Sequence, residues 1–221
     1  HTLAKVIAKT PVQHVVVSGL ADMMPWHKRH VVNFVIHQVK KAVPAYDLPL
    51  ATDFRRMLRR GAQVQFHKPD IQPDDLAFLQ YTGGTTGLSK GAVLTHRNVV
   101  AATLQAEAWF SPALARTGDI RNTNSIAALP LYHIFALTLC FLAVRWGSSL
   151  TLIPNPRDIP KFVQTLKQRP FHLLPGVNTL FNALTNEEWF TAFPPPHLKA
   201  AVAGGTALQR AVAERWSRIT G

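Results

Sequence analysis

The spacing of apolar residues divides the chain into alternating predicted strands and helices. Short apolar runs bounded by glycine, proline or polar residues are typical of buried strands. They fall at residues 14–19, 75–80, 91–95, 125–130, 149–153, 171–174 and 198–203. Helical spacing and capping residues predict helices over 31–43, 54–61, 97–109, 134–146, 158–167, 177–184 and 207–219. Asp53 is the predicted N-cap of the second of these helices. Because strand and helix alternate, we expect an α/β protein with mainly parallel sheets flanked by helices.

One polar stretch interrupts this alternation. Residues 111–124 are rich in Ser, Pro, Gly, Asn and Thr, which is typical of a linker. We therefore expect two partial lobes, residues 1–118 and residues 119–221. The first would be the end of one α/β lobe, and the second would be the start of the next.

Residues 126–144 raise the question of a membrane span, because they are nearly uncharged and almost long enough to cross a bilayer. Pro130 and His133 interrupt the stretch. A strand, a bend at Pro130 and a buried helix explain the pattern better than a span does.

The chain of 221 residues carries a formal net charge of +12, for which an anionic substrate, an anionic membrane and nucleic acid are the possible partners. A solvated basic surface, or the charge of a fragment whose acidic partner segments are missing, is the alternative interpretation. The basic residues are dispersed and do not interleave with aromatic residues, so we expect no nucleic-acid partner. Residues 54–61 form a basic amphipathic helix, for which a solvated face is the preferred interpretation. Contact of this helix with acidic lipid headgroups stays open.

The cysteine and histidine residues limit other kinds of site. Cys140 is the single cysteine, so no internal disulfide forms, and its Leu, Thr and Phe neighbours favour an inert core thiol. We expect a cytoplasmic protein, with peripheral contact to the inner face of the cell membrane left open. His27 and His30 share a predicted helix face, but no third ligand stands at useful spacing. No metal site is predicted from the side chains.

Residues 81–91 carry the strongest chemical signal. They read YTGGTTGLSKG and join two predicted strands. Glycines allow backbone N–H groups to turn inward and form an anion site, hydroxyls add donors, and Lys90 adds a compact positive charge. The predicted ligand is a polyphosphate, that of ATP above all. Phosphate binding is predicted for Thr82, Gly83, Gly84, Thr85, Thr86, Gly87 and Lys90.

Two common phosphate loops do not fit this stretch. No hydroxyl follows Lys90, as the mononucleotide-kinase pattern requires, and the glycines lack the dinucleotide-binding spacing. A glycine- and threonine-rich hairpin turn without a ligand is the remaining alternative.

The loop, followed by THRN at residues 95–98, resembles the phosphate-binding signature of the adenylate-forming enzymes, and most closely that of the long-chain fatty acid–CoA ligases. Three later stretches resemble further motifs of that family. Residues 129–135 resemble its aromatic substrate motif, residues 176–184 its acyl-pocket helix, and residues 203–208 its nucleotide-contacting turn. Ser89 departs from the wider superfamily, which often has proline there. The resemblance is weakest before Val64.

This resemblance implies an ATP-dependent ligase that activates a fatty acid as acyl-AMP and transfers it to CoA, with ATP, Mg²⁺ and CoA as cofactors or co-substrates. It implies catalytic roles for Lys90 and His133. A core histidine bonded to the backbone is the alternative interpretation of His133. It places nucleotide contacts at Gly205, Thr206 and Ala207, and fatty-acid contacts at Tyr132, His133 and Val177. An acyl tunnel lined from residues 131–141 and 177–184 is also implied, although an ordinary core would use the same residues.

Other functions stay open. The chain could belong to an adenylate-forming enzyme for an aryl or amino acid, or to a non-catalytic basic module for membrane or nucleic acid. Residues 133–142 and 177–184 contain no acidic residue to meet an ammonium group, which favours an uncharged acyl tail.

The family's later motifs and its C-terminal domain, with a catalytic lysine, are not found in these 221 residues. We therefore expect a segment of the large N-terminal domain, whose partner is the remainder of the ligase chain. Taken alone, this segment is expected neither to turn over nor to bind ATP tightly.

Overall fold

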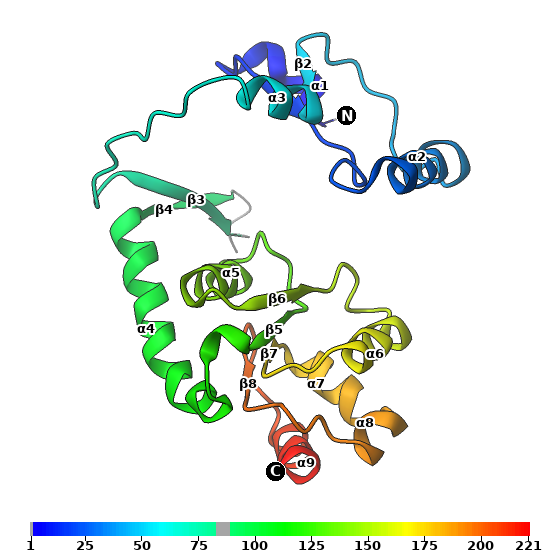
Figure 1. Cartoon of the computed structure of the whole chain (residues 1–221), viewed down its shortest axis with the longest axis vertical. Helices are drawn as coiled ribbons and strands as arrows, with labels where there is room; N and C mark the ends of the chain where they lie inside the picture. The colour runs from blue at the N-terminus through cyan, green and yellow to red at the C-terminus, as the bar shows by residue number, and fades with distance from the viewer. Residues whose placement is uncertain (1, 83–88) are drawn as a thin grey trace. The chain divides into compact units, whose positions relative to one another are not determined.

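The computed structural model describes residues 2–82 and 89–221 (Figure 1). Contacts between residues divide the chain into two compact units, His1–Asp70 and Ile71–Gly221. The lobes predicted from sequence meet near residue 118, inside the second unit. That assignment of lobes stays a prediction.

The first unit contains a two-stranded parallel sheet. β1 (Val15–Val17) pairs with β2 (Ala51–Asp53), which confirms the strand predicted over residues 14–19 and adds one that was not predicted. The helix predicted over 31–43 begins earlier, as α2 (Trp26–Phe34), and continues as a π-helix, η2 (Val35–Val39). The other elements of this unit are α1 (Thr2–Val6), the 3-10 helix η1 (Ile7–Lys9) and α3 (Phe54–Gly61).

Asp53 fixes the start of the basic helix α3. Its Oδ1 accepts a hydrogen bond from the Arg56 backbone N–H at 2.9 Å, which satisfies one of the donors that a helix leaves open at its N-terminus. The predicted cap is therefore confirmed.

The second unit is built on a four-stranded parallel sheet with strand order β6-β5-β7-β8. The mainly parallel α/β fold is thus confirmed. Every residue of β5 and β7, the two central strands, is buried. The four strands are β5 (Asn124–Ala127), β6 (Ser149–Leu152), β7 (Leu173–Gly176) and β8 (Ala200–Ala203).

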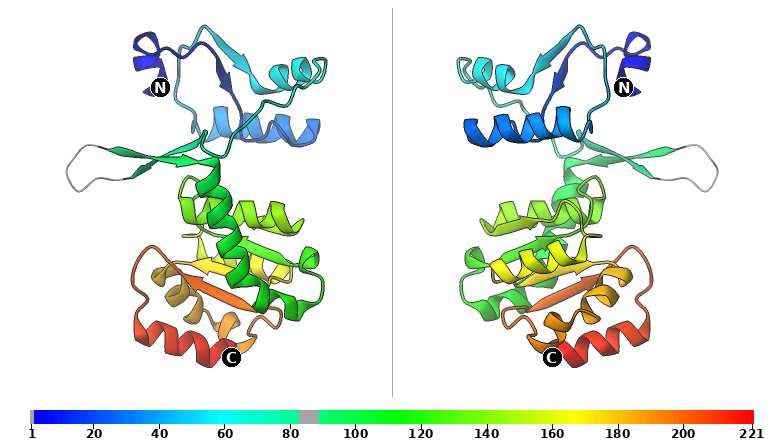
Figure 2. Two further views of the ribbon diagram at one scale, coloured as in Figure 1. Left: turned by 90° about the vertical axis from the view of Figure 1, so that its left-hand side faces the viewer. Right: turned by 90° about the vertical axis from the view of Figure 1, so that its right-hand side faces the viewer.

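Helices cover both faces of this sheet (Figure 2). Alternate residues of a strand point to opposite faces. Accordingly, Leu173 packs into the cluster formed with α4 and α5, whereas Leu174 packs into the cluster formed with the later helices. The helices are α4 (His96–Leu114), α5 (Ile134–Trp146), α6 (Ile159–Gln168), α7 (Asn178–Thr185), α8 (Glu188–Ala192) and α9 (Arg210–Thr220), with 3-10 turns η3 (Ala115–Thr117) and η4 (Ile120–Asn122).

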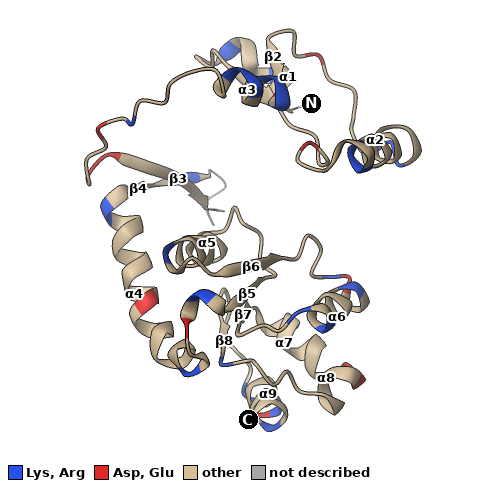
Figure 3. Cartoon of the chain, viewed as in Figure 1, with Lys and Arg blue, Asp and Glu red and all other residues tan. Residues whose placement is uncertain are grey.

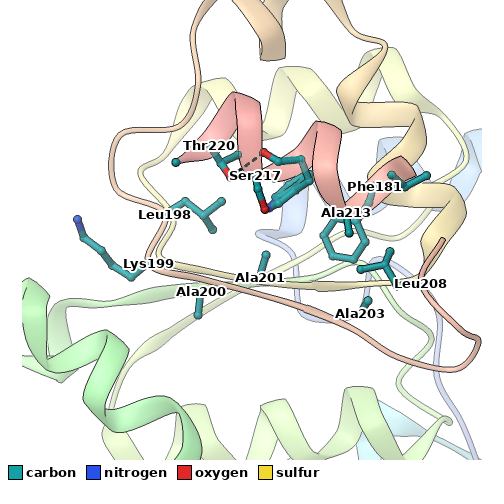
Figure 4. A pocket seen from close by; sticks show the side chains of 13 residues that line it. Phe181, Leu198, Lys199, Ala200, Ala201, Ala203, Leu208, Ala213, Ser217 and Thr220 are labelled. Carbon is teal, nitrogen blue, oxygen red and sulfur yellow. Dashed lines mark hydrogen bonds between the residues drawn. The ribbon is translucent and has the colours of Figure 1, made fainter. Parts of the chain in front are cut away.

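A cavity of about 330 Å³ lies between β8 and α9 (Figure 4). Its lining includes Ala201 and Ala203 of β8 and Trp216 of α9. Small alanine side chains on this face leave space that larger residues would fill. The lining of the cavity also includes Phe181, from the segment implied to line an acyl tunnel, but neither of the predicted catalytic residues Lys90 and His133.

The predicted phosphate loop joins two antiparallel strands, as expected. β3 (Leu76–Thr82) pairs with β4 (Lys90–Thr95), and Thr82 lies opposite Lys90. A capping box then starts α4: Thr95 Oγ1 accepts from the Asn98 backbone N–H at 3.3 Å, while Asn98 Oδ1 accepts from the Thr95 backbone N–H at 3.0 Å.

The predicted linker at residues 111–124 is partly wrong, because α4 continues to Leu114 and contains Pro112. Leu114 is fully buried against Leu139 and Leu142 of α5, and this burial offsets the single helical hydrogen bond that proline removes. Tertiary packing therefore overrides the local polar composition.

The strand and helix predicted in place of a membrane span are confirmed as β5 and α5. Among the residues that the structure describes, no helix is both long enough and apolar enough to cross a bilayer. Burial raises the pKa of the Cys140 thiol on α5, which agrees with its interpretation as an inert thiol.

His172, just before β7, accepts a hydrogen bond at Nδ1 from the Asn124 backbone N–H at 3.0 Å. Burial lowers the pKa of His172 from its ordinary value of 6.5, and the nearby His197 lowers it further. Protonation of Nδ1 would also remove the acceptor. The native state therefore binds protons less readily at this position than the unfolded chain does.

We predict that stability contributed by His172 is fully present above pH 6.5 and is lost as the pH falls toward the lowered native pKa. His172→Asn retains an acceptor oxygen but does not titrate. Urea unfolding at pH 7 and pH 5 should show a smaller loss of stability in this variant than in the parent. His67→Asn, at an exposed position, should behave as the parent does. Equal losses in all three proteins would contradict the prediction.

Candidate active site

The candidate site lies at one edge of the four-stranded sheet. Parallel strands end at a common edge, and segments that follow their carboxyl ends border ligand crevices in open α/β sheets. His133 follows β5, Val177 follows β7 and Gly205 follows β8. The topology thus gathers three predicted site residues that are far apart in the sequence.

Direct contacts join the segments after these strands. The Gly204 N–H donates to the Gly176 carbonyl at 3.0 Å. A Cβ atom on Gly204 would lie only 2.7 Å from Cε1 of Phe135, so glycine allows the ring to approach the turn. Gly205 has φ +83°, and a Cβ there would lie 3.7 Å from Cγ1 of Val177. Close packing therefore requires glycine at residue 204, and backbone conformation favours it at residue 205.

His133 is the N-cap of α5 and is exposed. Its Nδ1 accepts a hydrogen bond from the Phe135 backbone N–H at 3.4 Å. The alternative of a core histidine is wrong, although the backbone bond that it supposed is present. Since Nδ1 is engaged by the backbone, a ligand would meet Nε2.

The β3–β4 hairpin is attached to the segment that carries His133. The Gln80 side chain donates from Nε2 to the Tyr132 carbonyl at 2.9 Å. On the same strand, the Phe78 ring lies 5.8 Å from the Phe141 ring of α5. Gln80 is not among the site residues predicted from sequence, although it alternates with Phe78 on one face of the strand and is polar there.

Lys90, the first residue of β4, is exposed on that hairpin. Ala92 lies opposite Gln80, and Lys90 stands two residues from Ala92. Cross-strand partners and alternate residues share a face of a sheet, so Lys90 and Gln80 extend from the same face of the hairpin. Other predicted phosphate-binding residues, Gly83, Gly84, Thr85, Thr86 and Gly87, lie outside the described residues.

The remaining predicted site residues lie on the same turns. Tyr132 is exposed, Val177 is half-buried, and Thr206 and Ala207 are exposed in the turn between β8 and α9. Asn178, which sequence analysis did not identify, accepts at Oδ1 from the Gln209 backbone N–H at 2.9 Å and so joins this turn to α7. No sequence signal pointed to that bond.

The segments predicted to line an acyl tunnel also supply the core. Leu139 packs with α4, while Leu180, Phe181 and Leu184 belong to the cluster on the opposite face of the sheet. These residues pack in the core. The acyl tunnel stays a prediction, and the other residues of the two segments would line it.

Basic residues and possible metal ligands were each expected to bear on the kind of site. Basic residues are scattered over many elements, with a concentration on α3 (Figure 3). Within residues 2–82 and 89–221, no group of three or more His, Cys, Asp or Glu side chains could hold a metal ion. His27 and His30 therefore stand without a third ligand in the part of the chain that is described.

Comparison with known proteins gives a match over the whole chain. Residues 1–221 match the model of a family described as AMP-binding enzyme. Long-chain-fatty-acid–CoA ligases from Yersinia pestis and Haemophilus influenzae are each 49% identical over 222 residues, with 100% of this chain covered. The chain spans 39% of the length of these relatives.

A solved structure, ATP-bound MatB from Rhodopseudomonas palustris, resembles the fold with a TM-score of 0.67. The two sequences are 24% identical, and the match covers 99% of this chain and 40% of that chain. At this identity the likeness shows the fold alone.

We predict that Gly204→Ala lowers the free energy of unfolding by about 1–3 kcal/mol, because the new methyl group would press on the Phe135 ring. Gly61→Ala is the matched control: no atom lies within 4 Å of its added Cβ, so it should change stability by no more than about 1 kcal/mol. Chemical denaturation measures both. Adding Phe135→Leu to Gly204→Ala should recover part of the loss. A Gly204→Ala protein as stable as the parent would rule out the tight contact.

Proposed function

The chain belongs to the AMP-binding enzyme family, and on that premise we propose that it is a segment of an ATP-dependent long-chain fatty acid–CoA ligase. The complete enzyme would form acyl-AMP from a fatty acid and ATP, and would then transfer the acyl group to CoA. The remainder of the ligase chain would complete the active site, and this segment alone would be inactive.

One observation carries the proposal. The hairpin that bears Lys90 is joined by the 2.9 Å bond between Gln80 and Tyr132 to the segment that bears His133. That segment in turn contacts the Gly204 turn through Phe135. The 49% identity to long-chain-fatty-acid–CoA ligases supports the assignment of the substrate class.

The chemistry explains why these groups belong together. A carboxylate is a poor acylating agent, because CoA thiol cannot displace hydroxide from it at neutral pH. Attack of a carboxylate oxygen on the α-phosphorus of ATP forms the acyl-AMP bond and releases pyrophosphate. Attack of the CoA thiol on the acyl carbonyl then releases AMP and gives the thioester.

The residues of this chain would bind and orient ATP and the acid. Lys90 and the loop from Thr82 to Gly87 would stabilise charge that builds on the β- and γ-phosphates. His133, through Nε2, would donate to the α-phosphate or the carboxylate and hold them in line. Gly205, Thr206 and Ala207 would contact the nucleotide, while Tyr132 and Val177 would contact the acyl group.

In this proposal, magnesium would enter the site bound to the triphosphate. Mg²⁺ is commonly bound by substrate phosphates with one or two carboxylates and several waters. Among the described residues, no group of three or more His, Cys, Asp or Glu side chains could hold it. When bound, it would neutralise phosphate charge.

Residue content supports the proposed substrate and location. Residues 133–142 and 177–184 contain no acidic residue to pair with an ammonium group, which favours an uncharged acyl tail. The proposal includes a cytoplasmic protein that meets its fatty acid at the inner face of the cell membrane. On α3, Leu58 is 46% exposed beside Arg59 and Arg60, an arrangement that suits an anionic membrane surface.

The proposal is tested by ATP–pyrophosphate exchange on the full-length enzyme with a panel of carboxylic acids. We expect exchange with long-chain fatty acids, and at least about tenfold less with aryl acids or amino acids, because a hydrophobic pocket favours the longer apolar tail. Exchange that depends on an amino or aryl acid instead would refute the fatty-acid assignment.

Lys90→Ala should reduce fatty-acid-dependent exchange by about 10²–10³-fold, because it removes a charge aimed at the phosphates. Lys90→Arg should recover only part of the rate, since a guanidinium does not reproduce a compact ammonium. Lys161→Ala, at an exposed residue of α6, is the matched control and should exchange as the parent does. Unchanged exchange by Lys90→Ala would exclude the assigned role.

A further inference from the structure

Gln80 connects the β3–β4 hairpin to the segment that carries His133, two parts of the candidate site that lie far apart in the sequence. It lies on β3, two residues before Thr82, where the predicted phosphate loop begins. Its Nε2 donates to the Tyr132 carbonyl at 2.9 Å, across 52 residues of sequence. Tyr132 immediately precedes His133, so one side chain links the loop hairpin to the histidine.

The two faces of β3 differ in a way that gives Gln80 this role. Phe78 and Gln80 alternate on the face that meets α5, where Phe78 contacts Phe141. Leu79 and Tyr81 are 52% and 64% exposed on the other face. Aromatic packing thus attaches the base of the hairpin to α5, and the amide attaches the strand nearer to the loop.

The register extends this argument to Lys90. Gln80 lies opposite Ala92, and Lys90 is the next residue on the same face of β4. If this face of the hairpin moved away from Tyr132, Lys90 would therefore move away from His133. In the proposed function these two residues act on one nucleotide, at its terminal phosphates and its α-phosphate.

We infer that Gln80 is a positioning residue, which sets the placement of Lys90 relative to His133 through its hydrogen bond to the Tyr132 carbonyl. This inference rests on the proposed function. It assigns Gln80 no contact with substrate. Its effect should therefore appear in the rate of adenylate formation rather than in the stability of the fold, because the hairpin has its own strand pairing and its own packing on α5.

The test uses the full-length enzyme and the variant Gln80→Met, which keeps the length of the side chain and removes its donor. We expect kcat for ATP–pyrophosphate exchange with a long-chain fatty acid to fall at least about tenfold, since small misplacements of reacting groups reduce rates strongly. The melting temperature should change by less than about 4 °C. Gln105→Met, the same change at an exposed residue of α4, should leave both values unchanged.

A double-mutant cycle separates positioning from a general structural effect. If Gln80 acts by placing Lys90 relative to His133, Gln80→Met should cost less than about twofold once His133→Ala is present. Gln80→Lys restores an N–H donor of similar reach and should recover part of the rate in the parent background. Losses that multiply independently in the double variant, or a Gln80→Met enzyme with the parental kcat, would overturn the inference.

Hydrogen exchange gives a readout that does not depend on catalysis. In Gln80→Met, amides of residues 131–136 should exchange at least about threefold faster, while those of α9 should be unchanged. If the unmodified enzyme shows no fatty-acid-dependent ATP–pyrophosphate exchange, the proposed function fails. Amide hydrogen exchange alone then decides whether Gln80 holds residues 131–136 in place. Unaltered protection of residues 131–136 would refute the inference in either case.

Discussion

Complete burial of β5 and β7 is the constraint from which the arrangement of the site follows. Both strands are covered on both faces, so polar groups that need solvent or ligand cannot stand along them. The buried polar side chain of Asn124 is at the amino end and is satisfied: its Nδ2 donates to the Pro170 carbonyl, and its Oδ1 accepts from Thr151, each at 3.0 Å. Residues that bind ligand or react must therefore lie in the segments that follow the carboxyl ends of these strands.

Those segments are held together by close approach rather than by charge. The Gly204 turn reaches the Gly176 carbonyl by a backbone bond and accommodates the Phe135 ring because it has no side chain. The same ring lies two residues after His133, so packing at the glycine turn helps to fix the start of α5. Substitution at the turn would consequently act on the histidine without touching it.

The hairpin depends on a second set of contacts, centred on α4 and α5. Glu107 of α4 accepts from Arg145 Nε at 2.6 Å and from Trp146 Nε1 at 3.1 Å, which joins the middle of α4 to the last turn of α5. The capping box at Thr95 then aligns β4 with α4. With α4 fixed to α5 in this way, the contacts of Phe78 and Gln80 hold the hairpin beside His133.

Local pattern was sufficient for the class of fold and for most of its elements. Apolar runs located β5, β6 and β8, the helical period located α5, and Asp53 announced the start of α3, because these signals depend on residues that are neighbours in sequence. Glycine content and Lys90 likewise indicated an anion site from eleven consecutive residues. The extension of α4 through Pro112 did not follow from sequence, since it depends on Leu114 being buried by residues of α5.

By itself, then, the sequence determined that the protein is a parallel α/β fold with a lysine-bearing glycine loop, and which residues are candidates for its chemistry. Only the tertiary structure decided which candidates meet. Gln80 reaching Tyr132, Phe135 entering the space beside Gly204, and Asn178 bonding the Gln209 backbone all join segments distant along the chain. Such contacts are set by the order and direction of strands in the sheet, and no periodicity within one segment encodes them.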